Sequence, residues 1–200
     1  MDERETAVPT TRDETAETDN ERSLRAYVSD MLALERHFRE PLARQSDDKD
    51  VQRLAEAKQI IDELLSICER HANALDSSLS ALGGSTSSPV KSAWSQLLGF
   101  GAAAIDSIRK TKVSKDLRDD YTAISLATVS YSMLYTTGLV LGNRAVAELA
   151  KQLFTDYAAI VVRLGRLIPR VVVQELQLDG ESVAPGVVDT ATETVEAVWR

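Results

Sequence analysis

The chain has 200 residues, of which 44% are hydrophobic and 27% are charged, and this balance is typical of a globular domain. Nine glycines and five prolines are too few for the frequent turns of a β-sandwich or a β-barrel. The net charge of −8 argues against a nucleic-acid partner, because such proteins neutralise phosphates with Lys and Arg. The single cysteine, Cys68, excludes a disulfide within the chain and a metal cage of thiolates, and it favours a reducing compartment.

Residues 1–22 form an acidic segment with eight acids, three bases and almost no large apolar side chain. Such a segment cannot bury enough apolar surface to offset the entropy that is lost on ordering. We therefore predict a disordered acidic tail over residues 1–22. The segment also lacks the apolar stretch of a secretory signal peptide, so we expect a cytoplasmic protein.

Helical periodicity begins at Ser23, where apolar residues start to recur every three or four positions. The first helix is expected to end at the turn Ser46–Asp48, and Pro41 is expected to kink or weaken its last part. The side chains that share the apolar face of this helix are Leu24, Tyr27, Val28, Met31, Leu34, Phe38 and Leu42.

Two further helices are predicted over residues 50–111. The first of them runs from about residue 50 to 82 and ends at Gly83–Gly84, because glycine is favoured just beyond a helix C-terminus. After a loop of small residues, Ser88–Pro89 has the pattern of an N-cap followed by proline at the first helical position. A third helix is therefore predicted over residues 89–111.

A fourth helix is predicted at about residues 115–141, and Gly142–Asn143 separates it from a fifth helix at about 144–177. Pro169 is expected to bend the fifth helix. We assign residues 23–177 to one helical domain.

The stretch Tyr121–Asn143 contains no charged residue and is long enough to span a bilayer. It also carries seven Ser or Thr residues and lacks flanking aromatic and basic residues at both ends. We interpret it as a core helix surrounded by other helices, and we predict no membrane contact.

Residues 178–200 form a C-terminal extension with turn signals at Asp179–Gly180 and Pro185–Gly186. A short amphipathic helix is predicted over residues 189–200. Because Trp199 is costly to leave in water, we expect this extension to dock on its own bundle or on a partner protein.

Two titratable residues occupy positions on the apolar faces of the predicted helices. Glu35 lies between Met31 and Phe38 at helical spacing, and His71 lies in the same way between Cys68 and Leu75. On antiparallel neighbouring helices the two side chains would meet, either in a buried hydrogen bond or as half of a metal site.

Tyrosines recur in the last two predicted helices, and Tyr131 is expected to point inward because it follows Ile124 and Thr128 at helical spacing. The full set is Tyr121, Tyr131, Tyr135 and Tyr157. Buried tyrosines most often have a hydrogen-bonded hydroxyl rather than a redox role. We therefore predict a satisfied polar network of Glu35, His71 and a tyrosine hydroxyl.

Basic residues gather between Arg109 and Arg118, but Asp116 interrupts them, and Asp119 and Asp120 follow. We interpret this segment as solvated surface. The chain contains neither of the glycine-rich motifs that cradle nucleotide phosphates.

The run YVSDMLALERHFREPLARQ in the first helix resembles the opening helix of the YciE/YciF-like branch of the ferritin-like superfamily. The segments ICERHANALDSSLSAL and VLGNRAVAELAKQL fall where that branch has its second helix and its last hairpin. The likeness covers about residues 23–170 and rests mainly on the lengths, order and apolar pattern of the helices. It implies an all-α fold, namely a ferritin-like antiparallel four-helix bundle with an additional crossover helix.

Ferritin-like metal centres take a carboxylate from each of two helices and a Glu-x-x-His pair from each of the other two. Glu35 matches the first of these carboxylates. The second helix offers Glu69 and His71, which are two residues apart instead of three, and the fifth helix offers only Asp156. The fourth helix has no acid at the corresponding positions, which are Ile124, Ala127 and Tyr131. The resemblance thus implies a remnant metal site of Glu35, His71 and Asp156 and no catalytic residues.

We therefore expect a non-enzymatic ferritin-like protein without a cofactor, which acts through self-association or protein interaction. The resemblance also implies an association with bacterial stress. The alternative is a metal-binding oxidase or storage protein that holds iron or manganese at Glu35 and His71, in a site with fewer ligands than a complete centre. We further expect a homodimer, in which Gly99, Gly101 and Ala102–Ala104 let two helices approach closely.

Overall fold

A computed structural model describes residues 12–84 and 112–198 of the chain, and every regular element within them is a helix. The prediction of an all-α protein is confirmed. The predicted third helix, the crossover over residues 89–111, lies outside the described residues. The helices are α1 (Arg12–Asp47), α2 (Lys49–Gln52), α3 (Ala55–Ala81), α5 (Val113–Val140), α6 (Arg144–Leu178) and α7 (Val187–Val198).

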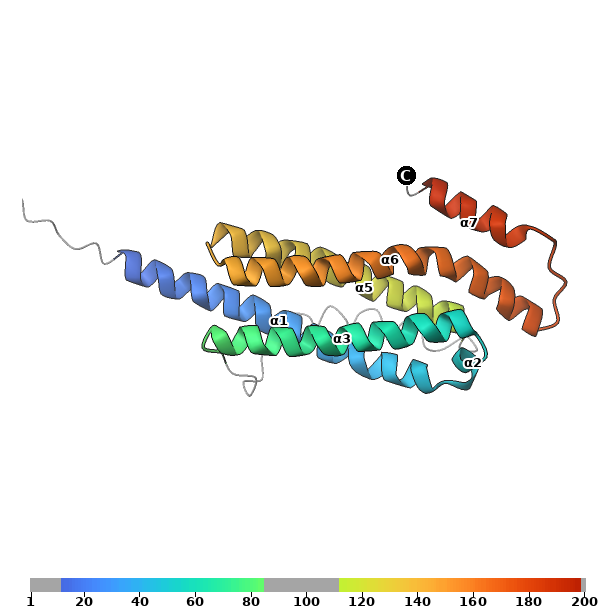
Figure 1. The fold of residues 1–200 in the computed structure, drawn as a ribbon, viewed down its shortest axis with the longest axis horizontal. Helices are drawn as coiled ribbons and strands as arrows, with labels where there is room; N and C mark the ends of the chain where they lie inside the picture. Colours follow the sequence, from blue (N-terminus) through green and yellow to red (C-terminus); the bar gives the residue numbers. More distant parts are fainter. Residues whose placement is uncertain (1–11, 85–111, 199–200) are drawn as a thin grey trace, which may run out of the picture.

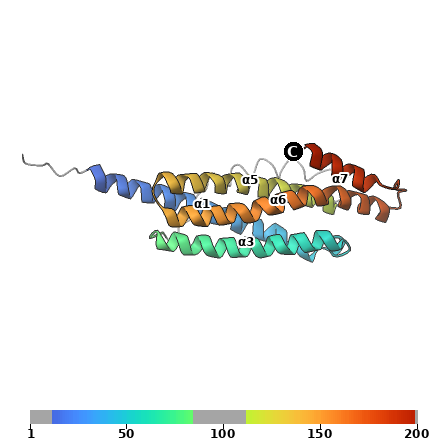
Figure 2. The same cartoon turned by 45° about the horizontal axis from the view of Figure 1, so that its top comes forward.

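The long helices α1, α3, α5 and α6 lie side by side (Figures 1 and 2). α1 packs mainly against α3, and α5 packs mainly against α6. The end of α3 lies beside the first half of α1, where the Arg25 side chain donates to the Leu82 carbonyl oxygen at 2.9 Å. The beginning of α5 lies at the opposite end of the molecule, where Lys112 pairs with Asp179 beyond the end of α6. The connection between α3 and α5 therefore joins opposite ends of the molecule.

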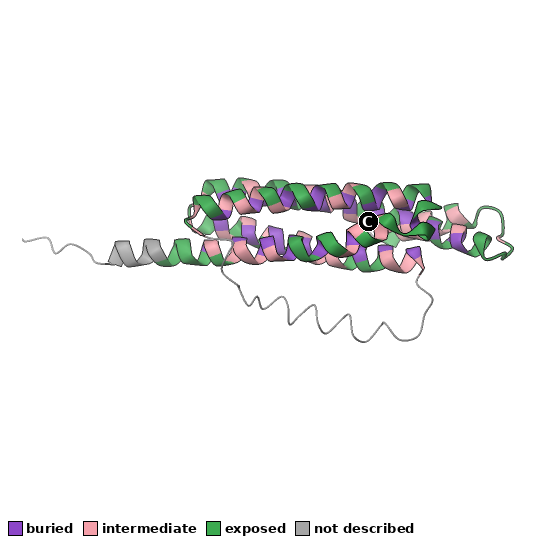
Figure 3. Cartoon of the chain, turned by 90° about the horizontal axis from the view of Figure 1, so that it is seen from below, coloured by how far each residue is buried: buried purple, intermediate pink, exposed green. Residues whose placement is uncertain are grey.

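The core consists of apolar stripes on the facing sides of these four helices (Figure 3). In α1 the predicted stripe is buried, except that Tyr27 is only partly buried. Burial of such stripes is the main source of stability for helices that would be marginal in isolation. The buried apolar residues of α5 recur every three or four positions, at Val113, Leu117, Ile124, Ala127, Tyr131 and Leu134.

α1 begins at Arg12, well before the predicted start at Ser23. Residues 12–22, which were predicted to belong to the acidic tail, are part of this helix. Their composition is polar but not unfavourable for a helix, and Arg22 pairs with Asp19 at 2.9 Å along the helix. This part of α1 projects beyond the other helices (Figure 1).

The predicted second helix is divided into α2 and α3 by a break at Arg53–Leu54. Asp48 caps α2 by accepting from the backbone N–H of Asp50 at 2.7 Å. The break lets both Val51 and Leu54 reach the core, with 0% and 5% of their surface exposed. The end of α3 is as predicted, since Gly83 has a φ of 71°, which favours glycine.

The helices α1 and α6 both continue past their internal prolines. α1 runs to Asp47, beyond Pro41, and α6 runs to Leu178, beyond Pro169. The expected weakening at Pro41 therefore does not end the helix. Packing of the flanking turns against the core offsets the lost backbone hydrogen bond at each proline.

One face of α5 is buried and the opposite face is exposed. The exposed apolar side chains include Val129 and Met133, which have 57% and 55% of their surface exposed. The sequence interpretation of a helix enclosed on all sides is therefore wrong for the described part of the molecule. By length and composition alone, α5 could also span a membrane, and 33% of its apolar 18-residue stretch is buried inside the protein.

The C-terminal extension folds back along its own chain. α7 packs against α6 (Figure 1), and Arg166 of α6 pairs with Glu196 of α7 at 2.8 Å. Val195 is half-buried beside this ion pair, whereas Val198 is exposed. A short helix was predicted here, and docking on the bundle was one of its two expected positions. Trp199 lies outside the described residues.

A close approach between α5 and α6 at Gly138 generates the first prediction. A methyl group at Gly138 would lie 2.8 Å from the backbone nitrogen of Ala147, so Gly138→Ala forces the two helices apart. We expect this substitution to lower the free energy of unfolding by about 1–3 kcal/mol, measured by urea denaturation. Gly165→Ala is the control, because a methyl group there lies 3.8 Å from the ring of Tyr121. Equal unfolding midpoints for the two variants would contradict the close contact at Gly138.

Candidate functional site: the buried Glu35 network

The carboxylate of Glu35 is fully buried at the centre of the four long helices. Its Oε1 atom accepts a hydrogen bond from the hydroxyl of Tyr131 on α5. Its Oε2 atom accepts one from the hydroxyl of Tyr157 on α6 at 2.5 Å. The Nδ1 atom of His71 on α3 lies 3.3 Å from Oε1. One side chain of α1 is thus bonded to a side chain of each of the other three long helices.

His71 links this carboxylate to the protein surface. Its Nε2 atom lies 3.2 Å from the Oδ2 atom of Asp156 on α6. The imidazole side chain is 2% exposed, whereas the Asp156 side chain is 33% exposed. Because carboxylate oxygens only accept, His71 can donate to Glu35 and Asp156 together only as the imidazolium cation. The chain of contacts therefore runs from solvent at Asp156 to the buried carboxylate.

The two tyrosines are held as neutral hydrogen-bond donors. Burial, and next the nearby carboxylate of Glu35, raise the pKa of the Tyr131 and Tyr157 hydroxyls well above the usual value. Their rings pack against the edge and face of His71, with a centroid distance of 4.6 Å for Tyr157 and 5.9 Å for Tyr131. The rings thereby seal the carboxylate from water while their hydroxyls satisfy it.

Cys68 lies beside this network but has no reactive partner in it. Its thiol donates to the backbone carbonyl oxygen of Glu35 at 2.9 Å. Burial is the main cause that raises the pKa of the Cys68 thiol, and the negative charge of Glu35 adds to the effect. A thiol of this kind stays protonated and is a poor nucleophile.

The structure brings together Glu35, His71 and Asp156, and it contains the predicted network of Glu35, His71 and a tyrosine hydroxyl. The second tyrosine, Tyr157, was among the tyrosines singled out in the sequence, but its contact with Glu35 was not predicted. Its neighbour Asp156 was the only residue of α6 that the sequence analysis named as a candidate metal ligand. Glu69 is not part of the site, because it pairs with Arg39 at the surface at 3.2 Å.

These residues do not fit a ferritin-like dinuclear metal centre. Such a centre needs about four carboxylates to balance two divalent ions, and the network has only Glu35 and Asp156. Both oxygens of Glu35 already accept hydrogen bonds from tyrosines, and both nitrogens of His71 face carboxylates. Among residues 19–84 and 112–198, no group of three His, Cys, Asp or Glu side chains is placed to hold an ion.

A second buried acid was missed by the sequence analysis. Asp120 was interpreted as part of a solvated segment, but it is only 8% exposed. The signal was present, since Asp120 lies three residues after Leu117 and four before Ile124, both of which are buried. The run of neighbouring charges obscured this spacing. Glu175 on α6 was missed as well, and its carboxylate accepts from the backbone N–H of Ser114 at 3.1 Å in the first turn of α5.

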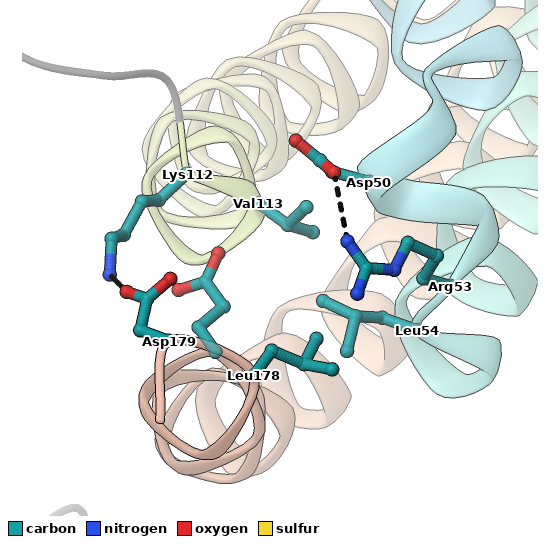
Figure 4. Close-up of a pocket in the computed structure, with 8 residues that line it drawn as sticks. Asp50, Arg53, Leu54, Lys112, Val113, Leu178 and Asp179 are labelled. Atoms are coloured by element: carbon teal, nitrogen blue, oxygen red, sulfur yellow. Dashed lines mark hydrogen bonds and ion pairs between the residues drawn. The ribbon is translucent and has the colours of Figure 1, made fainter. Parts of the chain in front are cut away.

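A cavity of about 420 Å³ opens between α2, the beginning of α5 and the end of α6 (Figure 4). Its two cations are both paired, Arg53 with Asp50 at 3.7 Å and Lys112 with Asp179 at 2.6 Å. The remaining charged lining residue, Glu175, binds Ser114. Each charge in the lining thus has a partner nearby, and the cavity does not indicate a particular ligand.

A crystal structure of a protein from Xanthomonas campestris pv. campestris is similar to this chain, with a TM-score of 0.64 and 16% sequence identity. The similarity covers 81% of this chain and 99% of the other chain. At this level of identity it shows a common fold and gives no information on chemistry. No family model and no curated protein matches the chain.

The network predicts a large loss of stability on truncation of Glu35. Glu35→Ala leaves His71, Tyr131 and Tyr157 buried without their common acceptor, so we expect it to cost about 3–5 kcal/mol in urea denaturation. Glu40→Ala on the same helix is the control, because Glu40 is exposed and its pair with Arg44 spans 3.5 Å. An exposed pair of this kind contributes about 0–1 kcal/mol. Similar unfolding midpoints for the two variants would mean that Glu35 does not hold the helices together.

Proposed function

We propose that this protein is a non-enzymatic, ferritin-like four-helix bundle that acts in the cytoplasm through self-association. The observation that carries the proposal is the arrangement around Glu35, where a ferritin-like protein would bind metal. Here tyrosine hydroxyls and His71 occupy the lone pairs of that carboxylate. Internal hydrogen bonds therefore do the structural work that metal ions do in a complete centre.

The antiparallel arrangement supports the ferritin-like assignment. α1 and α3 form one hairpin pair and α5 and α6 form the other, with a connection between them that joins opposite ends. This is the connectivity that a bundle with one long crossover requires. The crystal structure from Xanthomonas campestris pv. campestris supports the fold of this chain and not its metal chemistry.

The exposed face of α5 supports self-association. Its side chains recur at alternating spacings of four and three residues, all of them are uncharged, and all except the half-buried Leu126 are exposed: Thr122, Leu126, Val129, Met133, Thr136 and Val140. This is the spacing with which two like helices pack along a common seam. We call these six residues the outer α5 stripe.

A second copy of the chain is the occupant that the outer α5 stripe suits best. In a contact across a two-fold axis, the same surface of both chains meets, so each charge near the axis faces a like charge. The segment from Tyr121 to Asn143 has no charge and avoids that repulsion. Burial of exposed apolar side chains in an interface is favourable, and Val140, which has 77% of its surface exposed, has much apolar surface to bury.

A second candidate function is metal binding at Glu35 and His71, in a site that has fewer ligands than a ferritin-like centre and holds one ion. The observation that favours it is the position of Asp156, which contacts His71 and is open to solvent. An iron or manganese ion would then be held by Glu35, His71 and Asp156, and it would supply redox chemistry. It would have to displace the hydrogen bonds from Tyr131 or Tyr157, which argues for the non-enzymatic function.

Metal analysis separates these two functions. We expect no stoichiometric iron, manganese or zinc on protein that has been incubated with each ion, desalted and measured by mass spectrometry of the elements. The reason is that the ligands present do not compensate a dinuclear centre. One retained ion per chain that is lost in Glu35→Gln and kept in Glu40→Gln would contradict the proposal and establish the metal-binding alternative.

Self-association is tested at the outer α5 stripe. We expect a homodimer for the wild-type chain and a monomer for Met133→Glu, because the substitution places two carboxylates against each other at the dimer axis. Sedimentation velocity at matched concentrations measures the mass, and circular dichroism checks the helix content.

The control for this experiment is Val172→Glu, which adds the same charge at an exposed valine of α6. It should leave the dimer intact. A monomeric wild-type chain at high concentration would refute self-association. A dimer that survives Met133→Glu would show that the interface lies elsewhere, for example at Gly99 to Ala104, which lie outside the described residues.

A further inference from the structure

The buried Asp120 and the half-buried Gln45 form a pair at the end of the molecule away from the Glu35 network. The Nε2 atom of Gln45 on α1 donates to the Oδ1 atom of Asp120 on α5 at 3.1 Å. The other oxygen of each group, Oε1 of Gln45 and Oδ2 of Asp120, is buried and has no hydrogen-bond partner among the described residues. The two orphaned atoms therefore belong to side chains that are already bonded to each other.

Two acceptor oxygens cannot satisfy one another unless a hydrogen is placed between them. A carboxylic acid and a primary amide have complementary edges, because the acid accepts from the N–H and donates its own O–H to the amide oxygen. A single proton on Oδ2 of Asp120 thus gives both orphaned atoms a partner. Leaving both atoms unpaired would cost the desolvation energy of each of them.

We propose that Asp120 and Gln45 form a proton-binding clasp between α5 and α1, in which neutral Asp120 donates from Oδ2 to Oε1 of Gln45. The clasp is closed when Asp120 holds its proton. It weakens when the proton leaves, because Oδ2 of Asp120 and Oε1 of Gln45 are then both buried acceptors without a donor. The clasp is independent of the Glu35 network and of the outer α5 stripe.

The surroundings of Asp120 favour the proton. On α5 the nearby charges are the acids Asp116 and Asp119, and on α1 the partner is the uncharged Gln45. The pKa of Asp116 is affected by further charges on three elements. They are the acids Asp48, which precedes α2, and Glu175 on α6, together with the cation Lys115 on α5. Burial, opposed in part by the Gln45 hydrogen bond and reinforced by the two acids, raises the pKa of Asp120 to about 7. Burial also raises the pKa of Asp116 to about 6.

The sign of the pH dependence follows from this rise. The folded chain binds the Asp120 proton more tightly than the unfolded chain, whose ordinary carboxyl pKa is 3.8. The clasp therefore stabilises the fold fully below that ordinary value, and its contribution is lost as the pH rises through about 7. The junction of α1 and α5 should be tighter in mildly acidic solution than in alkaline solution.

Asp120→Asn is the decisive variant, because an amide reproduces the neutral acid without titrating. Its side-chain N–H can donate to Oε1 of Gln45, while its oxygen accepts from Nε2. We expect the Tm of Asp120→Asn to exceed that of the wild type at about pH 8, and we expect this difference to shrink as the pH falls toward the ordinary carboxyl value of 3.8. Asp76→Asn is the control, because Asp76 lies in an exposed ion pair with Arg36 at 3.4 Å and is not among the charges that act on Asp120. Its difference in Tm from the wild type should not vary with pH in this way.

A direct reading comes from the carbon-13 shift of the Asp120 carboxyl, followed by nuclear magnetic resonance across the same pH range. A titration midpoint near 7 supports the clasp, and a midpoint near 3.8 overturns it. A lower Tm of Asp120→Asn than of the wild type at about pH 8 also overturns it. If added Mg²⁺ or Ca²⁺ raises the Tm of the wild type but not of Asp120→Asn, a cation rather than a proton joins the two oxygens, and the proposal is wrong.

Discussion

The architecture depends on how the buried carboxylate of Glu35 is compensated. An uncompensated charge at such a position costs several kcal/mol, so the chain tolerates it only with donors on every side. Tyr131, Tyr157 and His71 supply these donors from α5, α6 and α3. Because hydrogen bonds have strict geometry, this one residue also sets how the four long helices are placed along their axes. Apolar packing alone tolerates sliding and exchange of similar side chains.

Asp120 is the second acid on an inward-facing stripe, and its environment is the opposite of that of Glu35. Glu35 is surrounded by donors, whereas Asp120 has one donor and two acidic neighbours. Burial and the two acidic neighbours raise the pKa of Asp120. One acid therefore joins the helices at the centre of the bundle through hydrogen bonds, and the other is the group on which the proposed clasp depends.

The two faces of α5 serve different purposes. Both carry side chains at alternating spacings of three and four residues, so either face alone would pass for a packing surface. The inner face holds Tyr131 and Asp120 and contacts the other helices of the same chain. The outer α5 stripe also has no charged side chain, yet most of it is exposed. This exposed, uncharged face of α5 is the feature on which the proposal of self-association rests.

The sequence by itself determined the all-α class, the ends of α3, α5 and α6, and the inward positions of Glu35 and His71. These features follow from periodicity and glycine signals, which act within a few residues of the chain. Only the tertiary structure decided which side chains meet. It brought Asp156 and Tyr157 of α6 to residues far away in the chain, buried Asp120 against Gln45, and left one side of α5 exposed. Periodicity shows which face of a helix is apolar, but it contains no information about which helix that face contacts, and the partners of a buried polar group depend on that contact.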